Sequence, residues 1–447
     1  MYILTNGRLI TRDPDAKGYY EKGAVVYEGS KIVEVGEEAA LTAKYPQAER
    51  IDAKGGVIMP AFINAHTHIY SALARGLSIV GNNPTNFFEV LDGTWWAIDR
   101  HLTLEGTRAS ADALYIDCIK QGVTTIFDHH ASYCQIPGSL FQIGESAKKF
   151  GIRSCLCYEV SDRDGEEKCL EAIQENADWI TYCQEHKDPM LAAMFGGHAL
   201  FTISDKTFDR MVAANNGRTG YHIHVSEGMN DVYDSLQNYG RRPVQRLQDH
   251  GILGEKTILG HCIHVNTAEM EIIKETGTMV VNNPESNMGN AIGICPVLQL
   301  YKRGILLGMG TDAYTNDMLE SIKVALCSQR SQNCLPNVGW CEVTDMLFKN
   351  NAKIGAKYFP DQLGVLKAGA AADIIVMDYK PFTPFSDENI DGHMIFGMTG
   401  RQCQTTIAAG KLLMKDRELV GIDEEAENAH ILEASKKLWG SLNRREY

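Results

Sequence analysis

Eight short apolar runs, each followed by a stretch long enough for a helix, limit most strongly what this chain can fold into. The runs are GVIMPAFINA, GVTTIFDHH, GIRSCLCYEV, MLAAMFGGHA, GYHIHVSE, KTILGHC, GTMVVNNP and GILLGMGTD. Continuous apolar runs that begin or end near glycine or proline are typical of strands buried on both faces. Eight strand–helix units in succession predict an α/β fold built as a (β/α)8 barrel of the TIM type.

The two ends of the chain have a different pattern. Segments such as YILTNGRLI, GAVVYEGSKIVEVG and CQTTIAAGKLLMKD alternate apolar and polar residues, and Asn6-Gly7 and Gly29-Ser30 are typical of turns. We therefore expect residues 1–57 and 366–447 to combine into one small β-sandwich domain, which also carries a C-terminal helix. Residues 58–365 would then form the barrel.

The net charge and hydropathy of the chain exclude some classes of binding partner. The chain of 447 residues has a formal net charge of −14 and no cluster of Lys and Arg, whereas non-specific binding to nucleic acids or anionic membranes needs such a cluster. The first residues do not resemble a signal peptide, and no apolar run is long enough to cross a bilayer. We predict a cytoplasmic protein with a small-molecule substrate, no nucleic-acid or membrane partner, and twelve free cysteines.

Side chains that can bind a metal ion stand at the ends of four runs, where a barrel of this type carries its catalytic groups. They are His66 and His68 after the first run, His222, His224 and Glu227 after the fifth, His261 and His264 after the sixth, and Asp312 after the eighth. His66 and His68 are two residues apart, so they share one face of a strand. Imidazole and carboxylate suit zinc and iron(II). The set favours a metal site over a satisfied polar network.

The motifs NAHTH, HVSEG, LGHC, NPESN and GTDAY, in this order, resemble the amidohydrolase superfamily. They are most similar to its mononuclear branch, which includes guanine, cytosine and S-adenosylhomocysteine deaminases and triazine hydrolases. GVLKAGAAADIIVMD resembles the β-domain segment of that branch. DHHAS, SNMGNA and GHMIFGM are similar to aminohydrolases named for an association with selenium metabolism. The resemblance covers nearly the whole chain but does not identify the substrate.

The resemblance implies a site built on one divalent metal, most simply zinc, although iron fits the same ligand types. The implied roles are metal binding for His66, His68, His224 and Asp312, proton transfer for Glu227, and orientation or polarisation for His261. Binuclear relatives bridge two metals with a lysine at the end of the fourth strand, whereas that run ends here in GGHALFTIS. This difference favours one metal and makes His198 a substrate contact.

The chemistry of these residue types supports the implied roles. A divalent metal lowers the pKa of a bound water toward about 7, so Asp312 could both bind the metal and take a proton. Attack on a ring carbon requires protonation of the ring nitrogen, and Glu227 is the candidate acid. A dry pocket would favour its protonated form.

The substrate contacts are less constrained by the sequence. His129 follows the second run, and Arg163 follows the third, where it could bind a carboxylate or a ring carbonyl or pair with a neighbouring aspartate. The polar groups suit a small nitrogen heterocycle, such as a purine or its breakdown product. Two positions depart from many relatives, which carry Lys-Leu at Gly289-Asn290 and often glycine after Asp312, where this chain has Ala-Tyr.

Three functions fit these residues. The leading one is an aminohydrolase that releases an exocyclic amine as ammonia. The alternative is a ring-opening cyclic amide hydrolase of the hydantoin or imidazolone type, with the same site. A non-catalytic scaffold is disfavoured because every expected ligand is present. The resemblance also implies a homo-oligomer, most simply a dimer.

Overall fold

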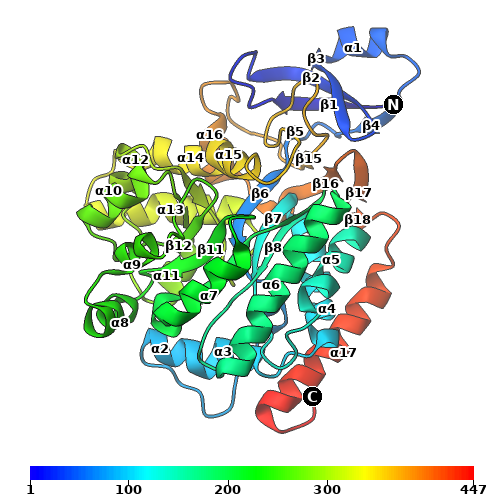
Figure 1. Ribbon diagram of the computed structural model, residues 1–447. Helices are drawn as coiled ribbons and strands as arrows, with labels where there is room; N and C mark the ends of the chain where they lie inside the picture. The colour runs from blue at the N-terminus through cyan, green and yellow to red at the C-terminus, as the bar shows by residue number, and fades with distance from the viewer.

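A computed structural model describes residues 1–447 as a mixed α/β fold with two sheets of parallel strands below a larger mixed sheet (Figure 1). All eight predicted runs contain strands. The first and fourth runs each divide into two: Val57–Pro60 (β5) and Phe62–Thr67 (β6), and Leu191–Ala193 (β9) and Phe195–Ala199 (β10). In each case the two pieces join different sheets, so the chain passes from one sheet to another within a single apolar run.

The parallel strands form a four-stranded sheet in the order β6-β7-β8-β9 and a five-stranded sheet in the order β10-β11-β12-β13-β14. The remaining bounds are Val123–His130 (β7), Arg153–Tyr158 (β8), Tyr221–Val225 (β11), Ile258–His261 (β12), Met279–Asn282 (β13) and Leu307–Met309 (β14). The two sheets meet at two parallel bridges, Thr67 with Asp312 and Val160 with Gly197. One of these bridges lies among the predicted site residues.

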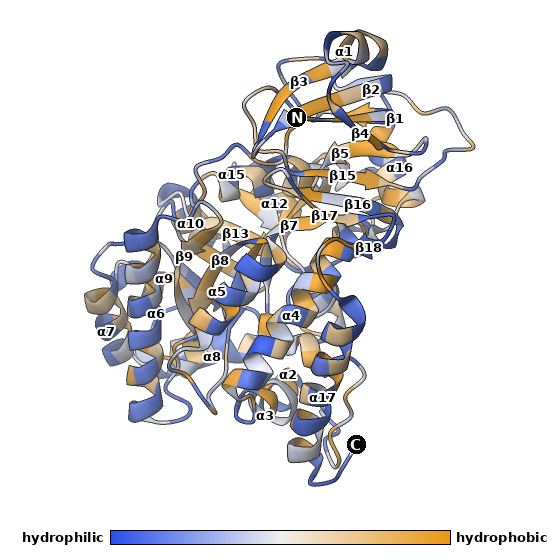
Figure 2. Cartoon of the chain, turned by 90° about the vertical axis from the view of Figure 1, so that its right-hand side faces the viewer, coloured by the Kyte–Doolittle hydropathy of each residue, from blue (hydrophilic) through white to orange (hydrophobic).

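Helices follow the parallel strands along the chain and cover the outside of the two sheets (Figure 1). They are Leu104–Gln121 (α4), Ser139–Phe150 (α5), Glu166–His186 (α6), Asp205–Asn215 (α7), Met229–Tyr239 (α8), Pro243–Asp249 (α9), Thr267–Glu275 (α10), Pro284–Gly289 (α11), Val297–Lys302 (α12) and Met318–Asn333 (α13). Figure 2 shows apolar strands inside and helices with polar outer faces. The arrangement explains the near-continuous apolar runs, because these strands are covered on both sides.

The chain ends form one nine-stranded sheet rather than the expected sandwich of two sheets. Its order is β18-β17-β16-β15-β5-β1-β2-β3, and β4 pairs with β1. The bounds are Tyr2–Ile10 (β1), Tyr19–Glu28 (β2), Lys31–Glu37 (β3), Glu49–Asp52 (β4), Ile374–Met377 (β15), Cys403–Ala408 (β16), Lys411–Lys415 (β17) and Glu418–Leu419 (β18). The difference arises at β5, which pairs with β1 on one side and β15 on the other.

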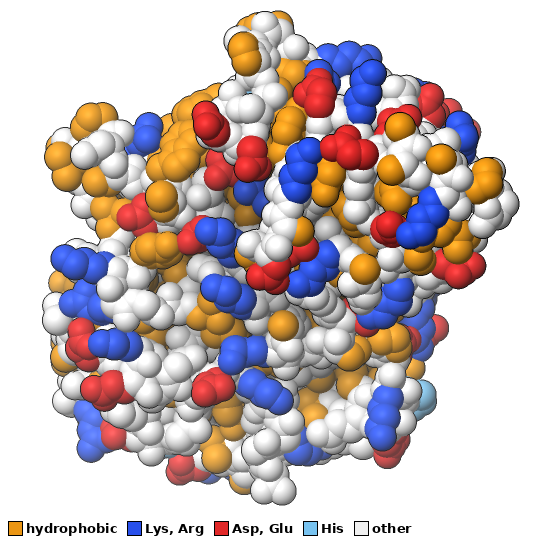
Figure 3. All heavy atoms as spheres, turned by 90° about the horizontal axis from the view of Figure 1, so that it is seen from above, with side chains coloured by type: hydrophobic (Ala, Val, Ile, Leu, Met, Phe, Trp, Pro, Cys, Tyr) orange, Lys and Arg blue, Asp and Glu red, His pale blue; other side chains and the backbone are white.

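The nine-stranded sheet connects to the parallel strands both covalently and through a buried ion pair. Ala61 alone separates β5 from β6. Arg153 at the start of β8 has no exposed side-chain surface and donates to Asp373, next to β15. Asp373 also accepts from Thr124 and from the backbone N–H of Ala409. On the face that Figure 3 shows from above, Lys and Arg side chains are intermingled with Asp and Glu.

The helix Glu424–Asn443 (α17) leaves the nine-stranded sheet and lies along α4 (Figure 1). Trp439 donates from Nε1 to the carbonyl of Leu73 at 2.8 Å, and Asn443 donates to the carbonyl of Ser78 at 3.0 Å. Both acceptors lie in the segment after β6. The end of the chain thus supports the segment that follows His66 and His68. No helix is long and apolar enough to cross a membrane.

Candidate metal centre and active site

The three predicted metal-binding histidines and the predicted orienting residue His261 are each held by the Nδ1 atom. His68 donates to the carbonyl of His129 at 2.5 Å, and His224 donates to the carbonyl of His198 at 2.8 Å. His261 donates to Asn287 Oδ1 at 2.7 Å, and His66 shares a 2.8 Å hydrogen bond with His222 Nε2. These contacts set the ring orientation, as the hydrogen-bond partners of metal-binding histidines commonly do. They leave the Nε2 atoms free to point inward.

The Nε2 atoms converge on the carboxylate of Asp312. His68 Nε2 lies 3.0 Å from Asp312 Oδ1, and His261 Nε2 lies 3.8 Å from Oδ2. His68 Nε2 and His224 Nε2 are 3.2 Å apart. The ligand atoms of His66, His68 and His224 lie within 4.8 Å of one another, as do those of His66, His261 and Asp312. The strand ends therefore place the predicted ligands around one centre.

Two buried nitrogens at this centre have no hydrogen-bond partner, His66 Nε2 and His261 Nε2. A buried polar atom without a partner is costly, and a bound cation would satisfy both. Burial is the largest cause that lowers the pKa of His66 and of His224 well below 6.5. Both rings are thus neutral, which is the form that binds metals. The residues present fit a divalent metal ion with nitrogen and oxygen ligands.

Asp312 is held in a conformation that the sequence alone does not predict. Its φ is 57°, in the left-handed region that costs a non-glycine residue roughly 1–3 kcal/mol. Ser286 donates to its Oδ2, and its backbone N–H donates to the carbonyl of His66. Burial would raise the pKa of this carboxyl, but His68, His261 and Ser286 outweigh burial and hold it far below its usual range. Asp312 is therefore an anion at the centre of the histidines.

Glu227 follows β11 and is the second carboxyl group at the centre. Its Oε1 lies 3.7 Å from His261 Nε2, and its side chain is 13% exposed. Burial, followed by the charge of Asp312, raises its pKa well above 4.5. Asp312 is thus ionised, while the surroundings of Glu227 favour its protonated form, an arrangement typical of acid–base catalysis.

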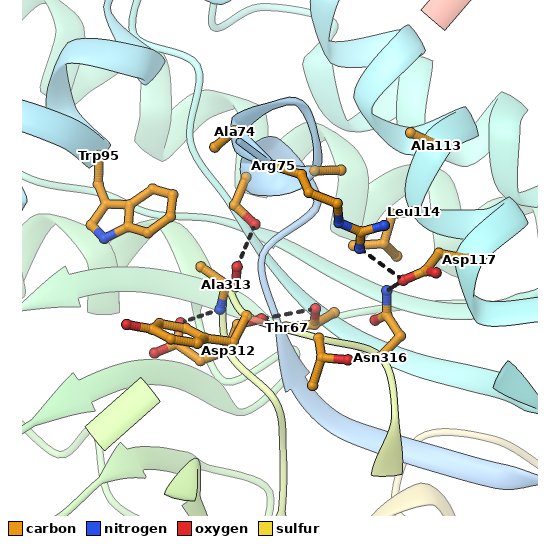
Figure 4. Close-up of a pocket in the computed structure, with 14 residues that line it drawn as sticks. Thr67, Ala74, Arg75, Trp95, Ala113, Leu114, Asp117, Asp312, Ala313 and Asn316 are labelled. Atoms are coloured by element: carbon orange, nitrogen blue, oxygen red, sulfur yellow. Dashed lines mark hydrogen bonds and ion pairs between the residues drawn. The ribbon is translucent and has the colours of Figure 1, made fainter. Parts of the chain in front are cut away.

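A cavity above these groups holds about 30 Å3 of free space. Its polar lining includes His68, His198, His224, His261, Asp312, Glu227 and Glu159. The other lining residues are Tyr70, Phe87, Leu91, Trp95, Ser286, Asn290, Ala313 and Tyr314. An outer cavity of about 140 Å3 lies on the other side of Ala313, between Trp95 and the ion pair of Arg75 with Asp117 (Figure 4). Trp95, Asp312, Ala313 and Tyr314 line both cavities.

The predicted substrate contacts occupy different positions. His198 lines the inner cavity and bonds Thr202 through Nδ1 at 2.9 Å. His129 and Arg163 do not line it. His129 lies behind the metal-binding histidines, where its Nε2 bonds the carbonyls of Gly197 and His222. The structure therefore places His129 as a support of the cluster rather than in contact with the cavity.

Arg163 is held away from the cavity by carboxylates. It donates to Asp99 and to Glu159 Oε1, the latter at 3.4 Å, and lies 3.3 Å from Asp164. Of the two interpretations left open by the sequence, pairing with nearby carboxylates is the one observed, chiefly with Asp99. This places Arg163 as the partner of buried carboxylates rather than as a group facing a ligand.

Glu159 is a cavity residue to which the sequence analysis assigns no role. It is 1% exposed, and its Oε2 lies 3.3 Å from His129 Nδ1. Burial raises its pKa, but His198, His129 and Arg163 outweigh burial and lower it to about 2. Its place directly after β8 was the signal that could have identified it. Asn287, which orients His261, and Ser286 both lie in the NPESN motif.

Comparisons with known proteins agree with this geometry. Residues 57–413 match the Amidohydrolase family, and residues 23–48 match the imidazolonepropionase-like composite domain of bacteria. The 5'-deoxyadenosine deaminase of Methanosarcina mazei is 30% identical over 99% of both chains. The 5-methylthioadenosine/S-adenosylhomocysteine deaminase of Thermococcus sibiricus is 31% identical over 88% of this chain and 90% of its own.

Solved structures share the fold at lower identity. An adenosine deaminase from Xanthomonas campestris with bound zinc superposes with a TM-score of 0.82, at 22% identity and 98% coverage of both chains. The zinc complex of atrazine chlorohydrolase from Arthrobacter aurescens gives a TM-score of 0.79, at 21% identity, over 97% of this chain and 100% of its own. With a family match over most of its length and a relative 30% identical along nearly all of it, the chain belongs to the amidohydrolase family.

Proposed function

We propose that this protein is a metal-dependent aminohydrolase that removes an exocyclic amino group, as ammonia, from a small nitrogen heterocycle of the purine type. The observation that carries the proposal is the convergence of four inward-facing Nε2 atoms, an ionised Asp312 and a Glu227 whose pKa is raised by burial, all at one cavity. Two relatives support the substrate class, because they are named as deaminases of 5'-deoxyadenosine and of 5-methylthioadenosine or S-adenosylhomocysteine.

In this proposal His66, His68, His224 and Asp312 hold one divalent metal ion, which we take to be zinc. The donor set of imidazoles and one carboxylate suits zinc, and two solved relatives contain it. The metal ion would supply Lewis-acid activation of a water molecule. The chain's own residues would then manage the protons and orient the heterocycle.

The protein groups divide this work by their charge. A C–O bond forms from water to the ring carbon while the exocyclic C–N bond breaks. Asp312, as an anion, accepts a proton from the attacking water, and Glu227, as an acid, donates to the ring nitrogen. The proton that Asp312 took up from water passes to the departing amine, which leaves as ammonia. As the carbonyl forms, the remaining hydroxyl proton returns to Glu227 and restores its acid form. His261 lies within 4 Å of both carboxyl groups and orients the attacking oxygen.

Three further features belong to the proposal. The parallel sheets, joined by bridges at both seams, act as one closed (β/α)8 barrel, in keeping with the solved relatives. Residues 58–365 are the barrel domain, and residues 1–57 and 366–447 are the companion domain, except that all of β5 (Val57–Pro60) belongs to the companion domain because it pairs with β1 and β15. The protein works in the cytoplasm as a homodimer. Its link to selenium metabolism stays a prediction from the sequence.

The test begins with the metal content per chain and continues on the same sample with ammonia release. The panel holds aminated purines and pyrimidines together with hydantoins. One zinc per chain and ammonia from an aminated purine are the expected results. Loss of a ring chromophore without ammonia would identify the ring-opening reaction instead. A protein without metal after gentle purification would contradict the assignment of the histidines.

A further inference from the structure

Tyr314 packs against Gly289 at the mouth of the inner cavity. The two residues stand where the sequence departs from many relatives, and the proposed reaction uses neither side chain. A Cβ atom added to Gly289 would lie 2.6 Å from Tyr314 Cζ and 2.7 Å from Cε1, far inside a normal contact. Gly289 ends α11 with an ordinary helical backbone. Its lack of a side chain is thus explained by the neighbouring ring and not by backbone conformation.

The ring is tied to the metal centre by hydrogen bonds. Tyr314 donates to Asn290 Oδ1 at 3.4 Å, and Asn290 donates to Ser286 Oγ at 3.2 Å. Ser286 in turn donates to the carboxylate of Asp312. Tyr314 is also only two residues beyond Asp312. The position of the ring is therefore set by α11 and by the same residues that set the carboxylate.

The opposite wall of the mouth is apolar. Phe87, Leu91 and Trp95 face the inner cavity from the helical segment after β6. A Cβ atom on Gly228, directly after Glu227, would lie 3.0 Å from Phe87 Cδ1. Figure 4 shows Trp95 facing Ala313 and Asp312 across the neighbouring cavity. The mouth is thus bounded by aromatic and aliphatic groups on one side and by Tyr314 and Asn290 on the other.

From this arrangement, and resting on the proposed function, we propose that Tyr314 determines substrate size. The site takes a purine as the free base and excludes the same base carrying a sugar. In this respect the chain would differ from its nucleoside deaminase relatives.

The physical reason lies in shape and polarity. The free space of the inner cavity is about 30 Å3, and the outer cavity begins beyond Trp95, Ala313 and Tyr314, which line both cavities. A flat base can enter between aromatic surfaces with a small displacement, and its ring nitrogens and exocyclic groups meet Glu159, His198 and Glu227. A sugar is not flat, and Trp95 and Tyr314 stand between the inner cavity and the polar groups of the outer one. The apolar rim of Phe87, Leu91 and Trp95 would therefore leave the sugar's hydroxyl groups without hydrogen bonds. The exclusion comes from this unfavourable burial and from the ring of Tyr314.

The first experiment compares kcat/KM for adenine and guanine with the values for their ribosides. The wild type should prefer the free base by at least about 100-fold, and Tyr314→Ala should reduce that preference at least about tenfold. Tyr314→Phe, which keeps the ring and removes the weak bond to Asn290, should keep the preference. A wild type that uses the riboside equally well, or a Tyr314→Ala variant with unchanged preference, overturns the proposal.

The second experiment tests the contact with Gly289 by a double-mutant cycle. Gly289→Ala should change KM for the free base in the wild-type background, because the added methyl group displaces the ring. In the Tyr314→Ala background the same substitution should change KM less than about twofold, since the obstructing ring is gone. Equal effects in both backgrounds contradict the role given to this contact.

A binding measurement separates this proposal from the proposed function. Calorimetric titration of the zinc-loaded protein with each base and each riboside needs no turnover. If the wild type binds the base more tightly than the riboside, and Tyr314→Ala reduces this difference in affinity, the size determinant is supported even if no ammonia is released. Ammonia release with equal binding of base and riboside leaves the aminohydrolase standing and overturns the size determinant. No binding of either base overturns it as well.

Discussion

The chemistry of single residues here depends on which nitrogen each imidazole turns inward. Every Nδ1 of the four histidines is bonded to a backbone carbonyl, an amide oxygen or another imidazole. The Nε2 atoms are then the only ones available to a ligand. A histidine replaced by glutamine or asparagine could keep one of these two bonds but not both, which is why imidazole is required at these positions.

Glu227→Gln should retain metal and lose turnover. The amide has the same shape but cannot deliver a proton, and general acid catalysis contributes about 10²–10⁴-fold. Metal content and ammonia release on the same preparation measure the two effects. Glu255→Gln, which alters a carboxylate that is 80% exposed, is the matched control and should leave both values unchanged. Full activity in Glu227→Gln would remove this residue from the proton pathway.

His130 gives a pH dependence with a defined sign. It is fully buried beside Tyr70 and Tyr158, and burial lowers its pKa to about 3. An unfolded chain protonates this residue below about 6.5. The unfolded state then binds more protons, so the contribution of His130 to stability is present above about pH 6.5 and declines as the pH falls from there toward 3.

Replacing His130 by Phe removes this dependence. As the pH falls below 6.5, the free energy of unfolding of the wild type should decrease relative to that of His130→Phe, by about 1.4 kcal/mol for each pH unit. Urea titrations at pH 7.5, 6.5 and 5.5 give the difference directly. Parallel profiles of the two proteins across this range would mean that the ring is protonated in the fold.

The sequence predicted that the histidines and Asp312 lie close together, because the strand ends in this type of fold share one edge. It could not predict the partners that come from distant segments. Asp99 lies 64 residues before Arg163, and nothing in either local sequence indicates that the two will pair. The departure at Gly289 and Tyr314 was visible in the sequence, but the contact between them was not.

At the scale of secondary-structure elements, the ends of β14 and β6 approach so closely that only glycine fits between them. A Cβ atom on Gly310 would lie 2.7 Å from His66 Cβ and 2.5 Å from Asn283 Oδ1. Thr311 and Asp312 both donate backbone hydrogen bonds to the carbonyl of His66. This contact holds Asp312 and His66 at the distance that a shared ligand requires.

Gly310→Ala should therefore lower the metal content without unfolding the protein. The added methyl group pushes the two strand ends apart, and even a small displacement spoils the geometry of a metal site. Circular dichroism checks the fold, and elemental analysis measures the metal. Gly254→Ala is a fair control, because nothing lies within 4 Å of the added atom. Normal zinc content in Gly310→Ala would mean that the contact between the ends of β14 and β6 tolerates the added methyl group.

The existence of the elements was predictable from the sequence, but their exchange between sheets was not. In the run GVIMPAFINA, Pro60 marks the end of β5, but nothing in the run indicates that the strand after it joins a different sheet. The run MLAAMFGGHA likewise changes sheets at Met194. A hydrophobic run indicates only that its residues are buried. Both runs stay buried where the chain passes from one sheet to the next, so the change of sheet leaves no mark in the sequence.

At the scale of the whole molecule, the nine-stranded sheet and the parallel strands are joined by the buried pair of Arg153 and Asp373. Arg153 has no exposed side-chain surface, and its other carboxylate neighbour, Asp361, is 3.9 Å away. A buried arginine that loses its anion is left with an uncompensated charge.

Asp373→Asn should destabilise the protein by about 3–5 kcal/mol, the cost of breaking a buried ion pair. Asp416→Asn, which disrupts the exposed pair with Lys54, should cost less than about 1 kcal/mol. Urea denaturation of the two variants gives the comparison. Equal costs for both would show that the buried pair contributes little to joining the sheets.

The pairing of β5 has a consequence for synthesis on the ribosome. One edge of β5 is filled by β1, but its other edge waits for β15, which is made roughly 300 residues later. At about 5–20 residues per second, the nascent N-terminal strands expose an unpaired edge for tens of seconds. The last strands to emerge are thus the ones that close the first sheet to be made. A chain cut short before β15 would keep an open strand edge that invites aggregation.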